Sequence, residues 1–140
     1  MKKLFTSILA VAAVIFTSPA QSHDAMTRFL TQLESLHEEM VSAFNNDDRS
    51  SMESICMSMI VLYDQQPGNV KSATKAMMGS VWYNVSCLRS LRGDIEGALE
   101  AMAEAVTHGW DNYTYTMNDP DLESVRNDPR FTDIISSIKR

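Results

Sequence analysis

The sequence has few cysteines, little basic charge and no long apolar run after residue 16. Its 140 residues include two Cys, and 12 Lys and Arg face 18 Asp and Glu, so the formal net charge is −6. A chain this acidic repels phosphate backbones and anionic membrane surfaces, which makes nucleic acid and lipid poor partners. Because no second apolar segment follows the first, we expect no stable membrane anchor.

Motifs of the common catalytic and cofactor sites are missing as well. The chain contains neither a Gly-rich phosphate loop nor a GxSxG nucleophile motif. His37-Glu38-Glu39 resembles part of a zinc motif, but Val41 stands where HExxH needs its second His. We therefore interpret this segment as a solvated polar helix face. The sequence predicts a protein that is not an enzyme and that needs no cofactor.

Residues 1–20 have the pattern of a cleaved signal peptide. Two lysines near the start precede an apolar run, and Ser18-Pro19-Ala20 supplies the small residues of a cleavage site. No Cys stands at that site, which argues against a lipid anchor. We expect an exported protein, periplasmic or secreted, whose mature chain begins at Gln21 or at His23. What remains fits one domain with one core.

Apolar residues recur at steps of three and four through the mature chain, a spacing typical of helices. This spacing predicts helices over residues 24–44 and 50–63, joined by an Asn- and Asp-rich turn in which Asp47 or Asp48 caps the second helix. No segment alternates with the period of a strand. The predicted fold is therefore all-α, built from antiparallel helical hairpins.

The second half of the chain continues the helical pattern. A third helix should run from the turn at Pro67-Gly68-Asn69 to Leu91, and Gly79-Ser80 can kink or divide it because Gly weakens a helix interior. A fourth should cover residues 95–107. Two Asp-Pro steps follow, at residues 119–120 and 128–129. Pro suits the first turn of a helix and Asp accepts from its free amides, so each step predicts a short helix.

Residues 81–106 resemble a tetratricopeptide repeat (TPR). The residues that match the family pattern are Trp82, Ser86, Gly93, Ala98, Met102 and Ala105. Two positions depart from it: Arg89 replaces the usual aromatic residue, and Trp110 stands where the closing Pro would be. In this pattern small residues let two helices approach closely, while Trp82 and Met102 fill the space between them.

The tail resembles the terminal segment that follows the last repeat of many such bacterial proteins. The resemblance implies a short TPR-like solenoid in which residues 21–66 form a degenerate hairpin, residues 67–108 the repeat and residues 109–140 a capping segment. Such a stack needs a terminal element with a polar outer face to cover its open end. Leu122, Phe131 and Ile135 are among the apolar residues expected to cover the last repeat.

The resemblance also implies a function. Members of the family bind peptides or protein segments in a groove, and the residues expected on or near that face here are Tyr83, Asn84, Cys87 and Ser90. Trp110, Tyr113 and Tyr115 are candidates for an aromatic contact patch, and packing of the terminal segment explains them equally well. We therefore expect a protein-protein interaction module whose partner is a protein or peptide. A homodimer is a further expectation, because it would extend the short groove.

Cys56 and Cys87 leave two alternatives open. In a straight hairpin that turns at Pro67-Gly68, the two cysteines lie about 12 Å out of register at about 1.5 Å per residue. A bridge tolerates about 7 Å between Cα atoms, so a disulfide requires the helix to break near Gly79. The alternative is two buried thiols that act as small hydrophobic side chains.

An alternative function is a metal-binding or redox accessory protein. A mature N-terminus of Gln21-Ser22-His23 would place an amine, two amides and an imidazole around Cu(II) or Ni(II), which makes His23 a weak candidate ligand. Met57, Met59, Met77 and Met78 could hold Cu(I), although Met at helical spacing is usually core. The thiols would supply the redox chemistry.

Overall fold

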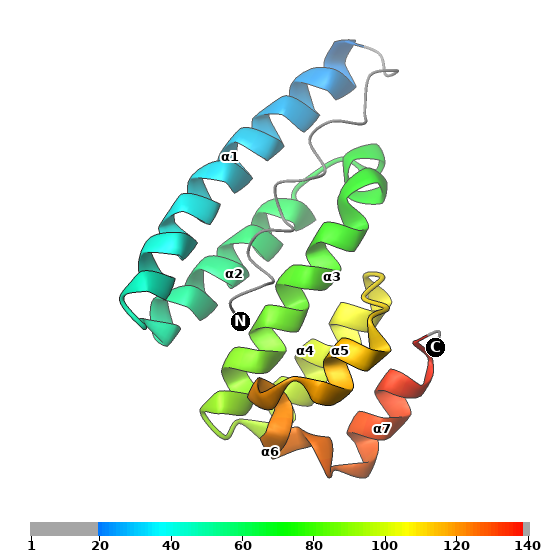
Figure 1. Ribbon diagram of the computed structural model, residues 1–140. Helices are drawn as coiled ribbons and strands as arrows, with labels where there is room; N and C mark the ends of the chain where they lie inside the picture. Colours follow the sequence, from blue (N-terminus) through cyan, green and yellow to red (C-terminus); the bar gives the residue numbers. More distant parts are fainter. Residues whose placement is uncertain (1–19, 139–140) are drawn as a thin grey trace. The chain divides into compact units, whose positions relative to one another are not determined.

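The computed structural model describes residues 20–138, with side chains from His23 onward (Figure 1). Residues 1–19, which hold nearly all of the predicted signal peptide, lie outside this range. The described chain is all-α and contains no strand, as the periodicity predicts. Its elements are α1 (Ala20–Asn45), α2 (Arg49–Asp64), α3 (Gly68–Leu91), α4 (Ile95–Thr107), α5 (Tyr113–Asn118), η3 (Pro120–Leu122), α6 (Glu123–Arg126) and α7 (Pro129–Ser136).

The described residues belong to two compact units, one ending at Lys75 and the other beginning at Ala76. The division falls inside α3, whereas the repeat pattern places a boundary between residues 66 and 67. Within the described range, no helix combines the length and the apolar character needed to cross a membrane.

The first unit is dominated by the antiparallel hairpin of α1 and α2 (Figure 1). Asp48 caps α2, since its side chain accepts a hydrogen bond from the Ser51 amide, and Asp47 before it has a positive φ of 51°. The apolar stripes of the two helices are buried. Their most buried members are Phe29, Leu33, Met40, Met52, Cys56 and Met59.

The start of α3 completes the first unit. Val70 is fully buried and Thr74 is nearly so, with the Thr74 hydroxyl donating to the Val70 carbonyl. The Tyr63 hydroxyl at the end of α2 donates to the Lys71 carbonyl at 3.3 Å. This bond ties the last turn of α2 to the first turns of α3.

Helix α3 runs unbroken through Gly79-Ser80, which corrects the expectation that these residues divide it. Gly79 has a packing role instead. A Cβ added there would lie 3.0 Å from the Trp110 amide nitrogen and 3.1 Å from the His108 carbonyl oxygen. Glycine is thus required because the backbone that leaves α4 passes directly over α3 at this point.

The second unit begins with the antiparallel hairpin of the later part of α3 and α4. The Ser86 hydroxyl donates to the Ala98 carbonyl at 2.8 Å, so the helices contact each other where the sequence pattern places small residues. Gly93 turns the chain with a φ of 82°, and Asp94 caps α4 by accepting from the Gly97 amide. Met102 is fully buried, while Trp82 is half-buried.

The C-terminal segment confirms both helix starts predicted at the Asp-Pro steps. Asp119 accepts from the Asp121 amide at the start of η3, and Asp128 accepts from the Arg130 amide at the start of α7. Helices α6 and α7 pack on α4, and Arg130 donates two hydrogen bonds to Glu96 at 2.7 and 2.8 Å. The fully or nearly buried side chains of this segment include Leu122, Val125, Phe131, Ile135 and Ile138.

Candidate functional site

The residues expected in an open groove of the repeat are buried in the second unit. The exposed fractions are 0% for Tyr83, 1% for Asn84 and Cys87, and 3% for Ser90. For Tyr83, Cys87 and Ser90 the cause is the chain's own C-terminal segment. These side chains lie on one stripe of α3, at spacings of four and three residues, and residues 110–124 pack against that stripe. These side chains therefore lie in the interior of the second unit and not on an open groove.

A buried hydrogen-bond network centres on Asp119, which is 4% exposed. The Tyr83 hydroxyl donates to Asp119 Oδ2 at 2.7 Å, and the Cys87 Sγ lies 3.8 Å from the same oxygen. Asp119 Oδ1 accepts from the Asp121 amide at 3.0 Å. The side chain that caps η3 therefore also links the capping segment to α3, and Arg126 donates to the Asp119 carbonyl.

The electrostatics of this network favour protonated groups on α3. Burial, followed by the charge of Asp119, raises the pKa of the Cys87 thiol well above its usual value. Burial is also the main cause of the raised pKa of Tyr83. Both groups are therefore neutral at physiological pH and can donate to the carboxylate, which is the arrangement that a buried anion needs.

An aromatic cluster covers the same network. The rings of Tyr83 and Trp110 stack with centroids 4.0 Å apart and planes 22° apart, and Tyr115 approaches both at 5.9 and 6.2 Å. Trp110 Nε1 donates to the Thr116 hydroxyl at 2.8 Å. Tyr113, the third residue of the expected contact patch beside Trp110 and Tyr115, is the half-buried first residue of α5. Trp110 thus packs within the unit at the position where the repeat pattern has its closing Pro.

Cys87, Asp119 and Asp121 bring their potential ligand atoms within 4.8 Å of one another. The geometry fits a metal poorly, because both carboxylate oxygens of Asp119 already accept hydrogen bonds and the thiol pKa is raised. We interpret the cluster as structural. The Asp-Pro pattern identifies Asp119 only as a helix cap, and a cap position gives no signal of a contact with a side chain 36 residues earlier.

The other candidate metal and redox residues are scattered. His23 is exposed in the first turn of α1, and the side chains of Gln21 and Ser22 lie outside the described part. Met59, Met77 and Met78 are buried. Cys56 in the first unit and Cys87 in the second are buried free thiols, and burial raises the pKa of Cys56 to about 12.

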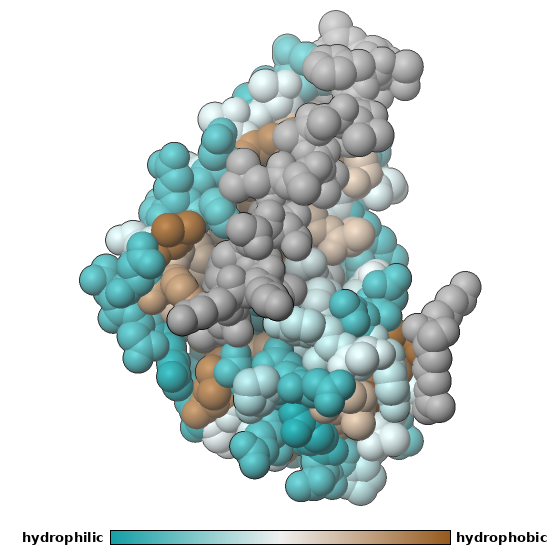
Figure 2. Space-filling model, viewed as in Figure 1, coloured by the Kyte–Doolittle hydropathy of each residue, from teal (hydrophilic) through white to brown (hydrophobic). Residues whose placement is uncertain are grey.

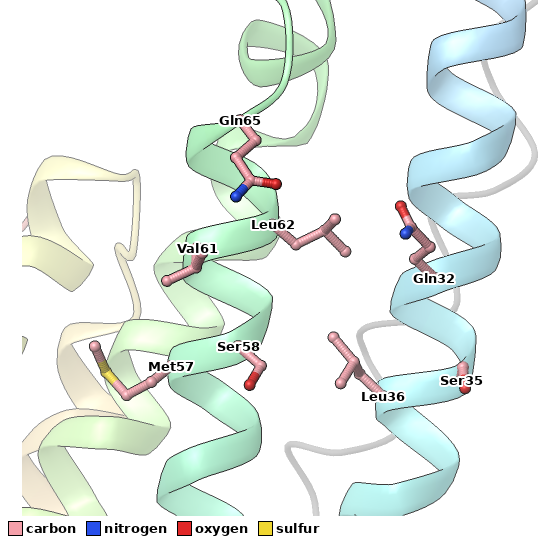
Figure 3. A pocket seen from close by; sticks show the side chains of 8 residues that line it. All are labelled: Gln32, Ser35, Leu36, Met57, Ser58, Val61, Leu62 and Gln65. Atoms are coloured by element: carbon pink, nitrogen blue, oxygen red, sulfur yellow. The ribbon is translucent and has the colours of Figure 1, made fainter.

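An open groove lies between α1 and α2 in the first unit (Figure 3). Its volume is about 540 Å³, and no charged side chain lines it. The apolar side chains of Leu36 and Leu62 point toward each other from the two helices, as Figure 3 shows. The complete lining is Gln32, Ser35, Leu36, Met57, Ser58, Val61, Leu62 and Gln65.

A second hollow shares Gln32 and Gln65 with this groove and continues along α1 to Ala25 and Arg28. Val61 on the groove is 53% exposed and Val41 elsewhere on α1 is 41% exposed, and these are the exposed large hydrophobic residues of the described chain. In Figure 2, brown apolar atoms appear between the teal atoms over this hairpin. The sequence contains an indication of this exposed apolar surface, because Met57, Val61 and Leu62 are apolar but fall outside the buried stripe of α2.

No family model, curated protein or solved structure matches this chain. The resemblance to tetratricopeptide repeats therefore depends on the residues alone.

Proposed function

We propose that this protein is a non-enzymatic protein-protein interaction module, built as a short TPR-like stack of helical hairpins. The observation that carries the proposal is the groove between α1 and α2, in which Leu36, Val61 and Leu62 are accessible between polar but uncharged side chains. An apolar centre with a polar rim is typical of surfaces that bind other proteins.

The groove and the adjoining hollow suit an amphipathic helix. Along α1 they extend from Ala25 to Leu36, which is about 16 Å at about 1.5 Å per residue and corresponds to about three turns of a bound helix. A partner helix would place apolar residues at helical spacing over Leu36 and Leu62 and polar residues over the glutamines. The uncharged lining of the groove itself favours a partner that places no charge directly over it.

Support for the TPR-like assignment comes from the contact between Ser86 and Ala98 and from the positive φ of Gly93. The C-terminal segment lies over the stripe of Tyr83 and Cys87, where the family would place a ligand. Partner binding is therefore proposed at the hairpin of the first unit rather than at this stripe.

Export is the second part of the proposal. It is supported by residues 1–20, which have the charge, apolar run and small residues of a signal peptide. Mass spectrometry of the protein purified from its cell envelope tests it, because a mature chain that begins at Gln21 or His23 is expected. An intact Met1 on the envelope protein would reject cleavage.

Two matched variants test the groove. Val61→Asp places a charge on the groove, whereas Val41→Asp makes the same change at a similarly exposed residue that does not line it. Each tagged protein is used for affinity capture from an envelope extract. We expect Val61→Asp to lose the proteins that the wild type retains and Val41→Asp to keep them. Equal recovery by all three proteins would argue against the groove as the binding surface.

A further inference from the structure

A line of four exposed residues on α1 borders the groove and continues beyond it. Arg28, Gln32, Ser35 and Glu39 are spaced by four, three and four residues, so they lie on one side of the helix. Arg28, Gln32 and Ser35 line the groove or the adjoining hollow, and Glu39 lies one turn further toward the hairpin turn.

The line has a cation at one end, an anion at the other and neutral residues between them. Among the described residues, neither Arg28 nor Glu39 has an ion-pair partner. When such a line is placed against a second copy of itself in the opposite direction, each Arg28 meets a Glu39. The crossing point falls between Gln32 and Ser35, beside the apolar side chains of the groove.

We propose that the partner of this groove is a second copy of this chain, with the two α1 helices antiparallel about a two-fold axis. The inference rests on the proposed function, because it assigns an occupant to the same groove. In the dimer, Arg28 of each copy pairs with Glu39 of the other, and the exposed apolar side chain of Val61 is buried near the centre. Two α1–α2 hairpins then form a four-helix arrangement.

Charge favours this occupant over an unrelated acidic or basic segment. The chain has a formal net charge of −6, so two copies repel each other over most of their surfaces. A neutral groove whose ends are complementary allows them to approach at this face without like charges in contact. A partner with a strong charge of one sign would be repelled either by Arg28 at one end of the line or by Glu39 at the other.

Charge reversal tests both the partner and the orientation. In Arg28→Glu each copy presents Glu against Glu39 of the other, and in Glu39→Arg each presents Arg against Arg28. We expect sedimentation velocity to show a concentration-dependent wild-type dimer and at least about a tenfold weaker dimer for each variant, because two symmetric contacts become repulsive. An equimolar mixture of the two variants should regain the wild-type dimer affinity, since both contacts are then attractive.

Controls separate folding from docking. All three positions are exposed, so the circular dichroism spectra of Arg28→Glu, Glu39→Arg and Val61→Asp should match the wild type. Their thermal midpoints should match it at concentrations low enough for the wild type to be monomeric, because dimerisation itself raises the midpoint. A monomeric wild type at all concentrations overturns the inference. Dimers that are unaffected by either reversal overturn the antiparallel register.

The capture experiment distinguishes this inference from the proposed function. If the wild type is a monomer while Val61→Asp still loses a captured envelope protein, the second copy is wrong and a different partner occupies the groove. If the wild type is a monomer and Val61→Asp changes nothing, both proposals fail.

Discussion

The Tyr83 hydroxyl donates a 2.7 Å hydrogen bond to the carboxylate of Asp119, 36 residues further along the chain. Both side chains are buried, so the bond fixes the C-terminal segment to α3 at a point where a missing donor would be costly. The same carboxylate caps η3, which couples a local helix start to a distant contact.

Tyr83→Phe should destabilise the second unit by about 1–3 kcal/mol, because it leaves a buried carboxylate without its hydroxyl donor. Urea unfolding gives the difference in the free energy of unfolding. Tyr115→Phe is the matched control, since the Tyr115 ring approaches Tyr83 and Trp110 but its hydroxyl has no hydrogen-bond partner among the described residues. Equal losses in the two variants would show that the Tyr83–Asp119 bond adds little.

Gly79→Ala and Gly68→Ala should change stability in opposite directions. At Gly79 the new methyl group would lie 3.0–3.2 Å from backbone atoms of residues 105–110, which cannot rotate away, so we expect a loss of about 1–3 kcal/mol. At Gly68 nothing lies within 4 Å, and Ala should stabilise α3 by up to about 1 kcal/mol. Thermal unfolding of both variants measures the signs. A stabilised Gly79→Ala would contradict the close backbone approach.

Cys56 and Cys87 should react slowly with a thiol reagent in the folded protein and rapidly after unfolding. Burial raises the pKa of both thiols, so little thiolate is present at neutral pH, and the reagent cannot reach buried sulfur. Spectrophotometric thiol counting in denaturant without reductant should find both thiols. A count of zero would establish the alternative that the sequence left open, a disulfide between them.

The ion pairs of Arg130 should support the second unit at neutral pH and not in acid. The hydrogen bonds of Arg130 are the first cause of the lowered pKa values of Glu96 and Asp128. A carboxyl group with a lowered pKa in the folded state stabilises the fold above its unfolded pKa of about 4, and this contribution is lost as the pH falls through the folded pKa. Arg130→Met should therefore be less stable than the wild type at neutral pH, and the difference in the free energy of unfolding should narrow in acid, as the pH falls below about 4.

Urea unfolding at neutral pH and in acid measures that gap. Lys75→Met provides a control, since it removes an exposed positive charge that forms no ion pair within the described part of the chain. Because the Arg130 pairs are exposed, added salt should also narrow the difference. A gap that is the same in acid would assign the effect of Arg130 to packing instead of charge.

Much of the local structure followed from short-range patterns. Asp48 and Asp94 cap their helices, and both Asp-Pro steps begin one, because a cap needs only a side chain and an amide two or three residues away. The apolar stripes of α1 and α2 identified their buried sides for the same reason.

The candidate site was less predictable. Tyr83 and Cys87 looked like groove residues because the repeat pattern places them on one side of a helix. Nothing within four residues of either indicates that Asp119 packs over that side. Gly79 was expected to weaken α3, but its role depends on the backbone of Trp110 and His108.

The helices, their caps and their turns follow from the order of the amino acids, since these features depend on interactions between residues a few positions apart. Tertiary structure decided which helix faces are covered and which remain open. It buried the stripe of Tyr83 under the C-terminal segment and left the neutral groove beside Val61 accessible. The physical reason is that the burial of a face depends on the distant segment that packs on it, and helical periodicity does not specify that segment.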